Sequence, residues 1–298
     1  MTTLRRAARR VRHLPGIERA DGLWRLVRRP YHWVLNAGGK GVRVDVGGIA
    51  AVRMPPEFAG GEWERYEPES VAALSTWARN HSSGTVVDIG SSIGIFSAVA
   101  LFSNATTRVV AIDSDLPSLA ASRRLCRHAA GTRMQLVHGL VSDVPTPRMS
   151  LAAAASDTAE RLLREGVHGE FGTTRYVCLA DSPAAEIPRL CLDDLLSAAE
   201  EARGPLLIKC DVEGAELLVL RGASALLRRA RPDLLLSVHP EALQDYGHAV
   251  DDIGAFLSRH GYAFRCIAVD HEEHWWCEPS PAPGTSRVDS HVDREAGA

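Results

Sequence analysis

The residues with the clearest chemical potential form one short block, Lys209, Asp211 and Glu213. Lys209 stands in the apolar run 206–210, which is typical of a strand buried on both faces. Charges in such a strand are costly unless they are paired or used. The block therefore predicts either a structural ion pair or a catalytic pair, in which Asp211 is the general base and Lys209 orients or acidifies the reacting group.

Two further residues are candidates for the same catalytic site. Glu213 precedes an apolar helical run, where the helix dipole favours an acid, so a structural role and a supporting catalytic role both stay open. His239 follows the apolar run 233–238 and is either a second general base or a polar cap. A divalent cation at Asp211 that polarises a hydroxyl is possible, but we predict no metal-ligand set.

A glycine turn between a strand and a helix predicts a cofactor site. Gly90 leaves room for a ligand, and backbone N–H groups near Gly94 would face an anionic group. The spacing is G-x-x-x-G, which differs from the dinucleotide-binding pattern G-x-G-x-x-G. Asp88 would meet an ammonium group and repel a diphosphate, so the loop favours an amino-acid-bearing nucleoside over NAD, with a purely structural turn as the alternative. We include Ser91 and Ile93 among the expected cofactor contacts.

Carboxylates after the next two strands extend this predicted site. Asp113 lies 19 residues after Gly94, where an acidic side chain of such folds holds the ribose hydroxyls, and Ser114 follows it. Ser142 and Asp143 follow the third strand, and Asp143 is placed to contact the adenine amino group. An aspartate that only caps the loop is an equally good interpretation of Asp143.

The elements that position these residues alternate between strand and helix. This order predicts a Rossmann-like α/β fold with a mostly parallel central sheet and helices on both faces. A C-terminal antiparallel pair of strands is expected to close the sheet. The expected strands are 85–89, 108–112, 135–141, 206–210, 233–238, 263–269 and 273–277, and the expected helices include 93–101 and 117–129.

Composition excludes several classes of partner. The 298 residues carry a net charge of −3, which does not favour a nucleic-acid partner. No apolar run reaches the ~18–20 residues of a membrane span, and we expect no signal peptide. The six cysteines form no C-x-x-C pair, which favours reduced thiols and a cytoplasmic location.

Three parts are expected along the chain. Residues 1–60 would hold a basic amphipathic helix and a small β-hairpin, 61–278 the catalytic domain, and 279–298 a disordered tail. The first 30 residues contain nine arginines and two acids, which indicates either weak membrane-surface contact or a solvated leader helix. The interval 144–205 would shape an acceptor pocket or form a loop without contact to substrate.

The run from His271 to His274 resembles metal-binding material, but it is not H-E-x-x-H. We expect an ordinary strand edge with alternating exposure there, and no metal site.

Several motifs together resemble the FkbM family of methyltransferases over roughly residues 60–277. They are Tyr66–Glu69, Asp88–Ser97, Leu192–Leu195, Ile208–Glu216 and Leu220–Ala223. The resemblance implies a class I methyltransferase fold, S-adenosylmethionine as methyl donor, and Asp88, Gly90, Gly94 and Asp113 in cofactor contact. It also implies O-methylation of a natural-product, sugar or lipid-linked hydroxyl.

We therefore expect in-line methyl transfer to a small-molecule hydroxyl. Holding the reactants aligned supplies about 7–11 kcal/mol in favourable cases. A nicotinamide-dependent oxidoreductase and a non-catalytic nucleoside-binding protein are the alternatives. Oligomeric state is not predicted.

Overall fold

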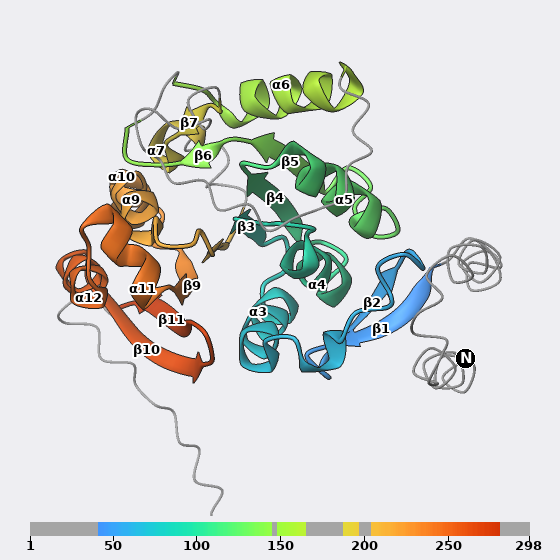
Figure 1. Cartoon of the computed structure of the whole chain (residues 1–298), viewed down its shortest axis with the longest axis horizontal. Helices are drawn as coiled ribbons and strands as arrows, with labels where there is room; N and C mark the ends of the chain where they lie inside the picture. Colours follow the sequence, from blue (N-terminus) through green and yellow to red (C-terminus); the bar gives the residue numbers. More distant parts are fainter. Residues whose placement is uncertain (1–40, 145–147, 165–186, 197–203, 281–298) are drawn as a thin grey trace, which may run out of the picture.

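The computed structural model describes residues 41–144, 148–164, 187–196 and 204–280. A seven-stranded sheet in the order β10-β11-β9-β8-β3-β4-β5 forms its centre (Figure 1). The sheet strands are β3 (Thr85–Ile89), β4 (Arg108–Asp113), β5 (Met134–His138), β8 (Leu206–Cys210), β9 (Asp233–Val238), β10 (Tyr262–Val269) and β11 (Glu273–Pro279). The five neighbouring strands β9, β8, β3, β4 and β5 run parallel, whereas β11 is antiparallel to both β9 and β10. The predicted fold class is thus confirmed, closing pair included.

Alternating side chains of the strands bury two separate cores, one on each face of the sheet. Val87 and Ile208 point to one face, while Val86 and Leu207 point to the other. This is the period-2 pattern of a strand covered on both sides. The helices are α3 (Pro68–Asn80), α4 (Ile95–Ser103), α5 (Leu116–Cys126), α6 (Leu151–Arg164), α7 (Leu192–Leu195), α9 (Glu216–Arg221), α10 (Ser224–Arg229), α11 (Pro240–Leu243) and α12 (Val250–Arg259).

Different helices cover the two faces. The core that contains Val86 joins α3, α4, part of α5 and a hairpin of β1 (Val42–Val46) and β2 (Ala50–Met54). The core that contains Val87 joins residues of α6, α7, α9, α10 and α12. Figure 1 shows the hairpin beside α4 and far from α12. The basic helix expected in the first 30 residues lies outside the described residues. So does the tail expected over 279–298, except for Pro279, which ends β11, and Ser280.

One predicted strand is divided in the structure. We expected a single strand over 135–141, but β5 ends at His138 and a separate β6 (Leu140–Val141) pairs with β7 (Arg189–Leu190). The chain leaves the sheet at Gly139, where its backbone packs closely against Leu190. A Cβ at this position would lie 2.5 Å from Cδ1 of Leu190. Glycine therefore permits the close packing that redirects the chain.

The strand order reverses at β3, because the chain continues from β3 to β4 and β5 on one side and later adds β8 and β9 on the other. Open α/β sheets bind ligands at the carboxyl ends of the strands beside such a reversal. Within the described ranges, no helix is both long and apolar enough to cross a membrane.

Candidate active site

The glycine turn after β3 lies directly against the loop that follows β8. Gly90 has a φ of 70°, and a Cβ at this position would lie 1.7 Å from the carbonyl oxygen of Asp211. We expected Gly90 to leave room for a ligand, and the structure shows that it makes room for the protein's own backbone. The turn therefore connects the predicted cofactor loop to the predicted catalytic loop.

Gly94 has a comparable packing role at the start of α4. Its φ is 83°, and a Cβ would lie 2.1 Å from Oγ of Ser122 on α5. The N–H groups of Gly90 and Ser91 both donate to the carbonyl of Ile112, and that of Gly94 donates to Ser91. These three amides are thus satisfied within the protein, rather than free for an anion as we expected.

Two buried oxygen atoms near this turn have no hydrogen-bond partner among the described residues. Asp88 is fully buried, and its Oδ2 accepts a 2.6 Å hydrogen bond from Oγ of Ser97. Its Oδ1 and the Oγ of Ser91 have no partner. Burial raises the pKa of Asp88. Buried polar atoms are normally satisfied, so this pair fits a ligand that brings hydrogen-bond donors, such as the ammonium group of an amino acid.

Asp113 lies beside the turn, and its hydrogen-bond partners differ from those of Asp115. Its two carboxylate oxygens accept hydrogen bonds from the backbone N–H groups of Ser92 (2.6 Å) and Asp115 (2.8 Å). Burial raises the pKa of Asp113 to about 6, although these hydrogen bonds oppose the rise. Asp115 instead caps α5 by accepting from the N–H and hydroxyl of Ser118. Asp113 thus lies against the glycine turn and Asp115 serves α5, while the role of Asp113 as ribose ligand stays a prediction.

The other predicted cofactor residues lie around the same loops. Ile93 packs partly buried against the α4 side of the sheet. The carbonyl oxygen of Ser114 lies 2.9 Å from Nε2 of His138. Ser142 follows β6 and donates from its hydroxyl to Asp143 over 3.3 Å.

Lys209 and Asp211 form an ion pair in which the side chain of Lys209 is buried and that of Asp211 is 21% exposed. Nζ of Lys209 lies 2.8 Å from Oδ2 of Asp211 and 4.7 Å from the ring centre of Phe96. Burial lowers the pKa of Lys209, but the charges of Asp211 and Asp88 outweigh it and raise the pKa overall. Burial raises the pKa of Asp211, and Lys209 outweighs it and lowers the pKa overall. Both groups are therefore charged at neutral pH.

His239 lies among four carboxylates. Its Nδ1 is 2.7 Å from Oε1 of Glu216, and its Nε2 is 3.6 Å from Oδ1 of Asp211 and 3.7 Å from Oε2 of Glu213. The fourth carboxylate, Glu272, contacts Nε2 directly. Burial lowers the pKa of His239, but the contacts with Glu216 and Glu272 raise it to about 10. A histidine that holds its proton at neutral pH is a poor general base, which favours Asp211 for that role.

The alternating exposure expected for the run from His271 to His274 is confirmed, but the run does not belong to an edge strand. β11 lies between β9 and β10, and Glu272 and His274 are 3% and 1% exposed. Nε2 of His274 is 3.6 Å from Oε1 of Glu272, and its Nδ1 is 3.6 Å from Oε2 of Glu67. The sequence analysis did not assign Glu67, Glu216, Glu272 or His274 to the site, although the dense His/Glu run was a signal.

Backbone strain concentrates near these residues. Glu67, Ser92 and Glu213 have φ values of 37°, 48° and 52°. Left-handed conformations are unfavourable for residues with a Cβ and often mark functional sites. One of these residues lies before α3, one in the glycine turn and one in the loop after β8.

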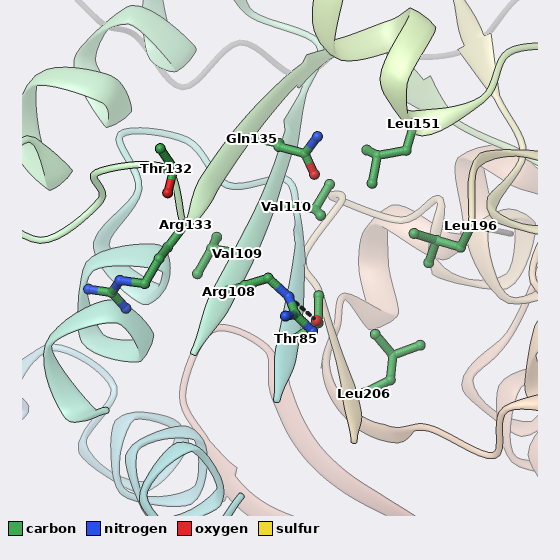
Figure 2. A pocket seen from close by; sticks show the side chains of 10 residues that line it. All are labelled: Thr85, Arg108, Val109, Val110, Thr132, Arg133, Gln135, Leu151, Leu196 and Leu206. Carbon is green, nitrogen blue, oxygen red and sulfur yellow. Dashed lines mark hydrogen bonds between the residues drawn. The ribbon is translucent and has the colours of Figure 1, made fainter. Parts of the chain in front are cut away.

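A separate cavity of about 180 Å³ lies at the opposite edge of the sheet. Its lining includes Thr85, Arg108 and Leu206, which are the first residues of β3, β4 and β8 (Figure 2). It lies at the amino ends of the parallel strands and therefore away from the carboxylate cluster.

Comparison with known proteins identifies a family. The family model of the methyltransferase FkbM domain matches residues 88–264. No curated protein matches the chain.

Several solved structures are similar to parts of this chain at low sequence identity. Methyltransferase FkbM from Methylobacillus flagellatus KT is 20% identical with a TM-score of 0.44, and the match covers 66% of this chain and 43% of that chain. This chain thus spans less than half of that protein. Precorrin-6y C5,15-methyltransferase from Geobacter metallireducens GS-15 is 14% identical with a TM-score of 0.44, over 80% and 100% of the two chains. An O-methyltransferase family protein from Burkholderia thailandensis is 12% identical with a TM-score of 0.40, over 72% and 57%.

Proposed function

Because the chain belongs to the FkbM family of methyltransferases, we propose that it transfers a methyl group from S-adenosylmethionine to a hydroxyl oxygen. The acceptor would be a small molecule, a sugar or a lipid-linked compound. The observation that carries the proposal is the contact between the two loops at Gly90 and Asp211. It brings a turn suited to an amino-acid-bearing nucleoside beside a buried Lys–Asp pair.

The chain's own residues account for cofactor binding in this proposal. Asp88 would accept from the amino-acid ammonium group through its unpartnered Oδ1, with Ser91 beside it. Asp113 would accept from the ribose hydroxyls, and Ile93, Gly94 and Ser114 would border the nucleoside. Ser142 and Asp143 would contact the adenine. When bound, S-adenosylmethionine supplies a methyl group on a positively charged sulfur.

Asp211 would remove the proton from the acceptor. Oδ1 of Asp211 would accept the proton of the acceptor hydroxyl while that oxygen receives the methyl group that the bound donor would supply. Lys209 holds the other oxygen, Oδ2, and thereby fixes and ionises the carboxylate. His239 borders Oδ1 of Asp211, Glu213 lies beside His239, and both would orient the acceptor. The low pKa of Asp211 requires that proton transfer accompany methyl transfer rather than precede it.

A cytoplasmic location belongs to the same proposal. It rests on the sequence prediction of reduced thiols, since no C-x-x-C pair occurs.

The test is Asp211→Asn in a methyl-transfer assay with a broad set of hydroxylated acceptors. Loss of a general base lowers turnover by about 10²–10⁴-fold, while binding of S-adenosylmethionine in calorimetry stays within a few fold. Asp251→Asn is the matched control, because Asp251 is exposed in the first turn of α12.

Three results would contradict the proposal. Unchanged turnover of Asp211→Asn would remove this residue as the base. Binding of NAD(H) instead of S-adenosylmethionine would favour an oxidoreductase. Binding of S-adenosylmethionine without methylation of any acceptor would favour a non-catalytic nucleoside-binding protein.

A further inference from the structure

Three side chains from separate segments converge on one point beside the ion pair. Asp211 follows β8, His239 follows β9 and Glu272 precedes β11. One ligand atom of each lies within 4.8 Å of the other two. We propose that these three residues bind a divalent cation at the carboxyl edge of the sheet.

The imidazole of His239 is arranged as that of a metal ligand. Its Nδ1 faces Oε1 of Glu216 at 2.7 Å, and this carboxylate is fully buried and also accepts from the N–H of Gly214. Metal-binding histidines commonly donate one ring N–H to a carboxylate, which leaves the other nitrogen for the metal. Nε2 of His239 is buried and has no hydrogen-bond partner among the described residues, and a cation that binds there would displace the proton that the surrounding carboxylates otherwise keep on this imidazole.

The two carboxylates each present one oxygen to this nitrogen while a neighbour holds the other oxygen. Asp211 directs Oδ1 toward Nε2 of His239 at 3.6 Å, while Oδ2 is bonded to Lys209. Glu272 directs Oε2 toward Nε2, while its Oε1 lies 3.6 Å from Nε2 of His274. Asp211 is therefore oriented before an ion binds, and Glu272 lies between the two imidazoles.

Charge and access also favour a cation. Four carboxylates surround His239, and Lys209 bonds to only one of them. The side chain of Glu213 is 55% exposed and lies 3.7 Å from Nε2 of His239. It therefore marks a path to solvent and offers a third oxygen, which would be a fourth ligand.

The ligand set suits a first-row divalent ion. Imidazole favours metals such as Zn²⁺ and Fe²⁺, whereas carboxylates favour Mg²⁺ and Mn²⁺. One nitrogen and two oxygens, with positions left for water or substrate, match Mn²⁺ best. A cation bound to Oδ1 of Asp211 would itself lower the pKa of the acceptor hydroxyl, in place of direct proton transfer to Oδ1, and only this consequence rests on the proposed function.

The test measures binding of Mn²⁺ alone to the full chain after treatment with a chelator. Electron paramagnetic resonance of free Mn²⁺ should show one equivalent bound per chain, without methyl donor or acceptor present. Glu272→Gln and Asp211→Asn should each weaken binding by at least about tenfold. Glu241→Gln is the matched control, because Glu241 is exposed on α11, and it should bind as the wild type does. Circular dichroism melting shows whether each variant is folded.

Two results would overturn the proposal. One is the absence of saturable Mn²⁺ binding below about 1 mM, and the other is equal binding by wild type and folded Glu272→Gln. In either case the carboxylates and the imidazole of the cluster share protons and do not bind a metal ion. Methyl transfer that persists in chelator would leave the proposed function intact, so the two ideas fail separately.

Discussion

The glycine turn after β3 and the carboxylate–histidine cluster beyond β8 lie in contact but are built differently. In the turn, backbone N–H groups of Gly90 and Ser91 bond to Ile112, and that of Ser92 to Asp113. In the cluster, side chains from before α3, from β8, after β9 and before β11 bond to one another. One region depends on local backbone geometry, and the other on distant side chains.

The two regions should therefore be sensitive to different kinds of substitution. A turn built from backbone tolerates changes of side chain but not an added Cβ at its glycines. A cluster of buried charges can be packed compactly. It does not tolerate the loss of one charged partner, because the remaining charge is then left uncompensated. Four experiments test this contrast.

The largest effect is expected for Lys209→Met. This change leaves Asp88 and Asp211 without their nearest cation, and breaking a buried pair in this way costs about 3–5 kcal/mol of unfolding free energy. Urea unfolding followed by circular dichroism measures the loss. The double variant Lys209→Met, Asp211→Leu should recover part of it. A loss below about 1 kcal/mol would equal that of an exposed salt bridge and contradict the buried-cluster interpretation.

The next effect concerns two neighbouring carboxylates. Asp113→Asn should weaken S-adenosylmethionine binding by about 100-fold, because each hydrogen bond to a charged group contributes about 1.5–3 kcal/mol. Asp115→Asn should leave the affinity unchanged, since Asp115 caps α5 and asparagine is also a good cap. Calorimetric titration of both variants decides the point, and equal affinities would remove Asp113 from the cofactor site.

A smaller effect is expected at the contact between the two regions. Gly90→Ala should destabilise the fold by about 1–3 kcal/mol more than Gly247→Ala, owing to overpacking against Asp211. The two glycines have φ values of 70° and 68°, but a Cβ at Gly247 meets nothing within 4 Å. Backbone strain is thus matched, and only the steric clash differs. Equal thermal unfolding of the two variants would contradict the close approach.

The smallest effect is a pH dependence of cofactor affinity. Burial raises the pKa of Asp113 to about 6, and the charges of Asp115 and Asp88 add to the rise. The ionised form accepts from the ribose hydroxyls, so binding must expel a proton at low pH. Affinity should therefore fall about tenfold from pH 7 to pH 5. Asp113→Asn should abolish this slope in calorimetry, and a slope that persists would assign the titration to another group.

Much of the fold was predictable from the sequence. The strands at 85–89, 206–210 and 233–238 are confirmed at the expected residues, because apolar runs of that length bounded by turn residues specify buried strands locally. The division at Gly139 was not predictable, since it depends on Leu190, which is 51 residues away along the chain.

The individual strands, the glycine turn and the proximity of Lys209 to Asp211 follow from the sequence alone, because each depends on residues close together in the chain. Only the tertiary structure decided that Glu67, Glu216, Glu272 and His274 join His239 and Asp211. Their convergence depends on β11 inserting between β9 and β10, a long-range pairing that no local pattern encodes. The run from His271 to His274 was therefore wrongly interpreted as a strand edge, since alternation along a strand does not reveal which neighbours cover its two sides.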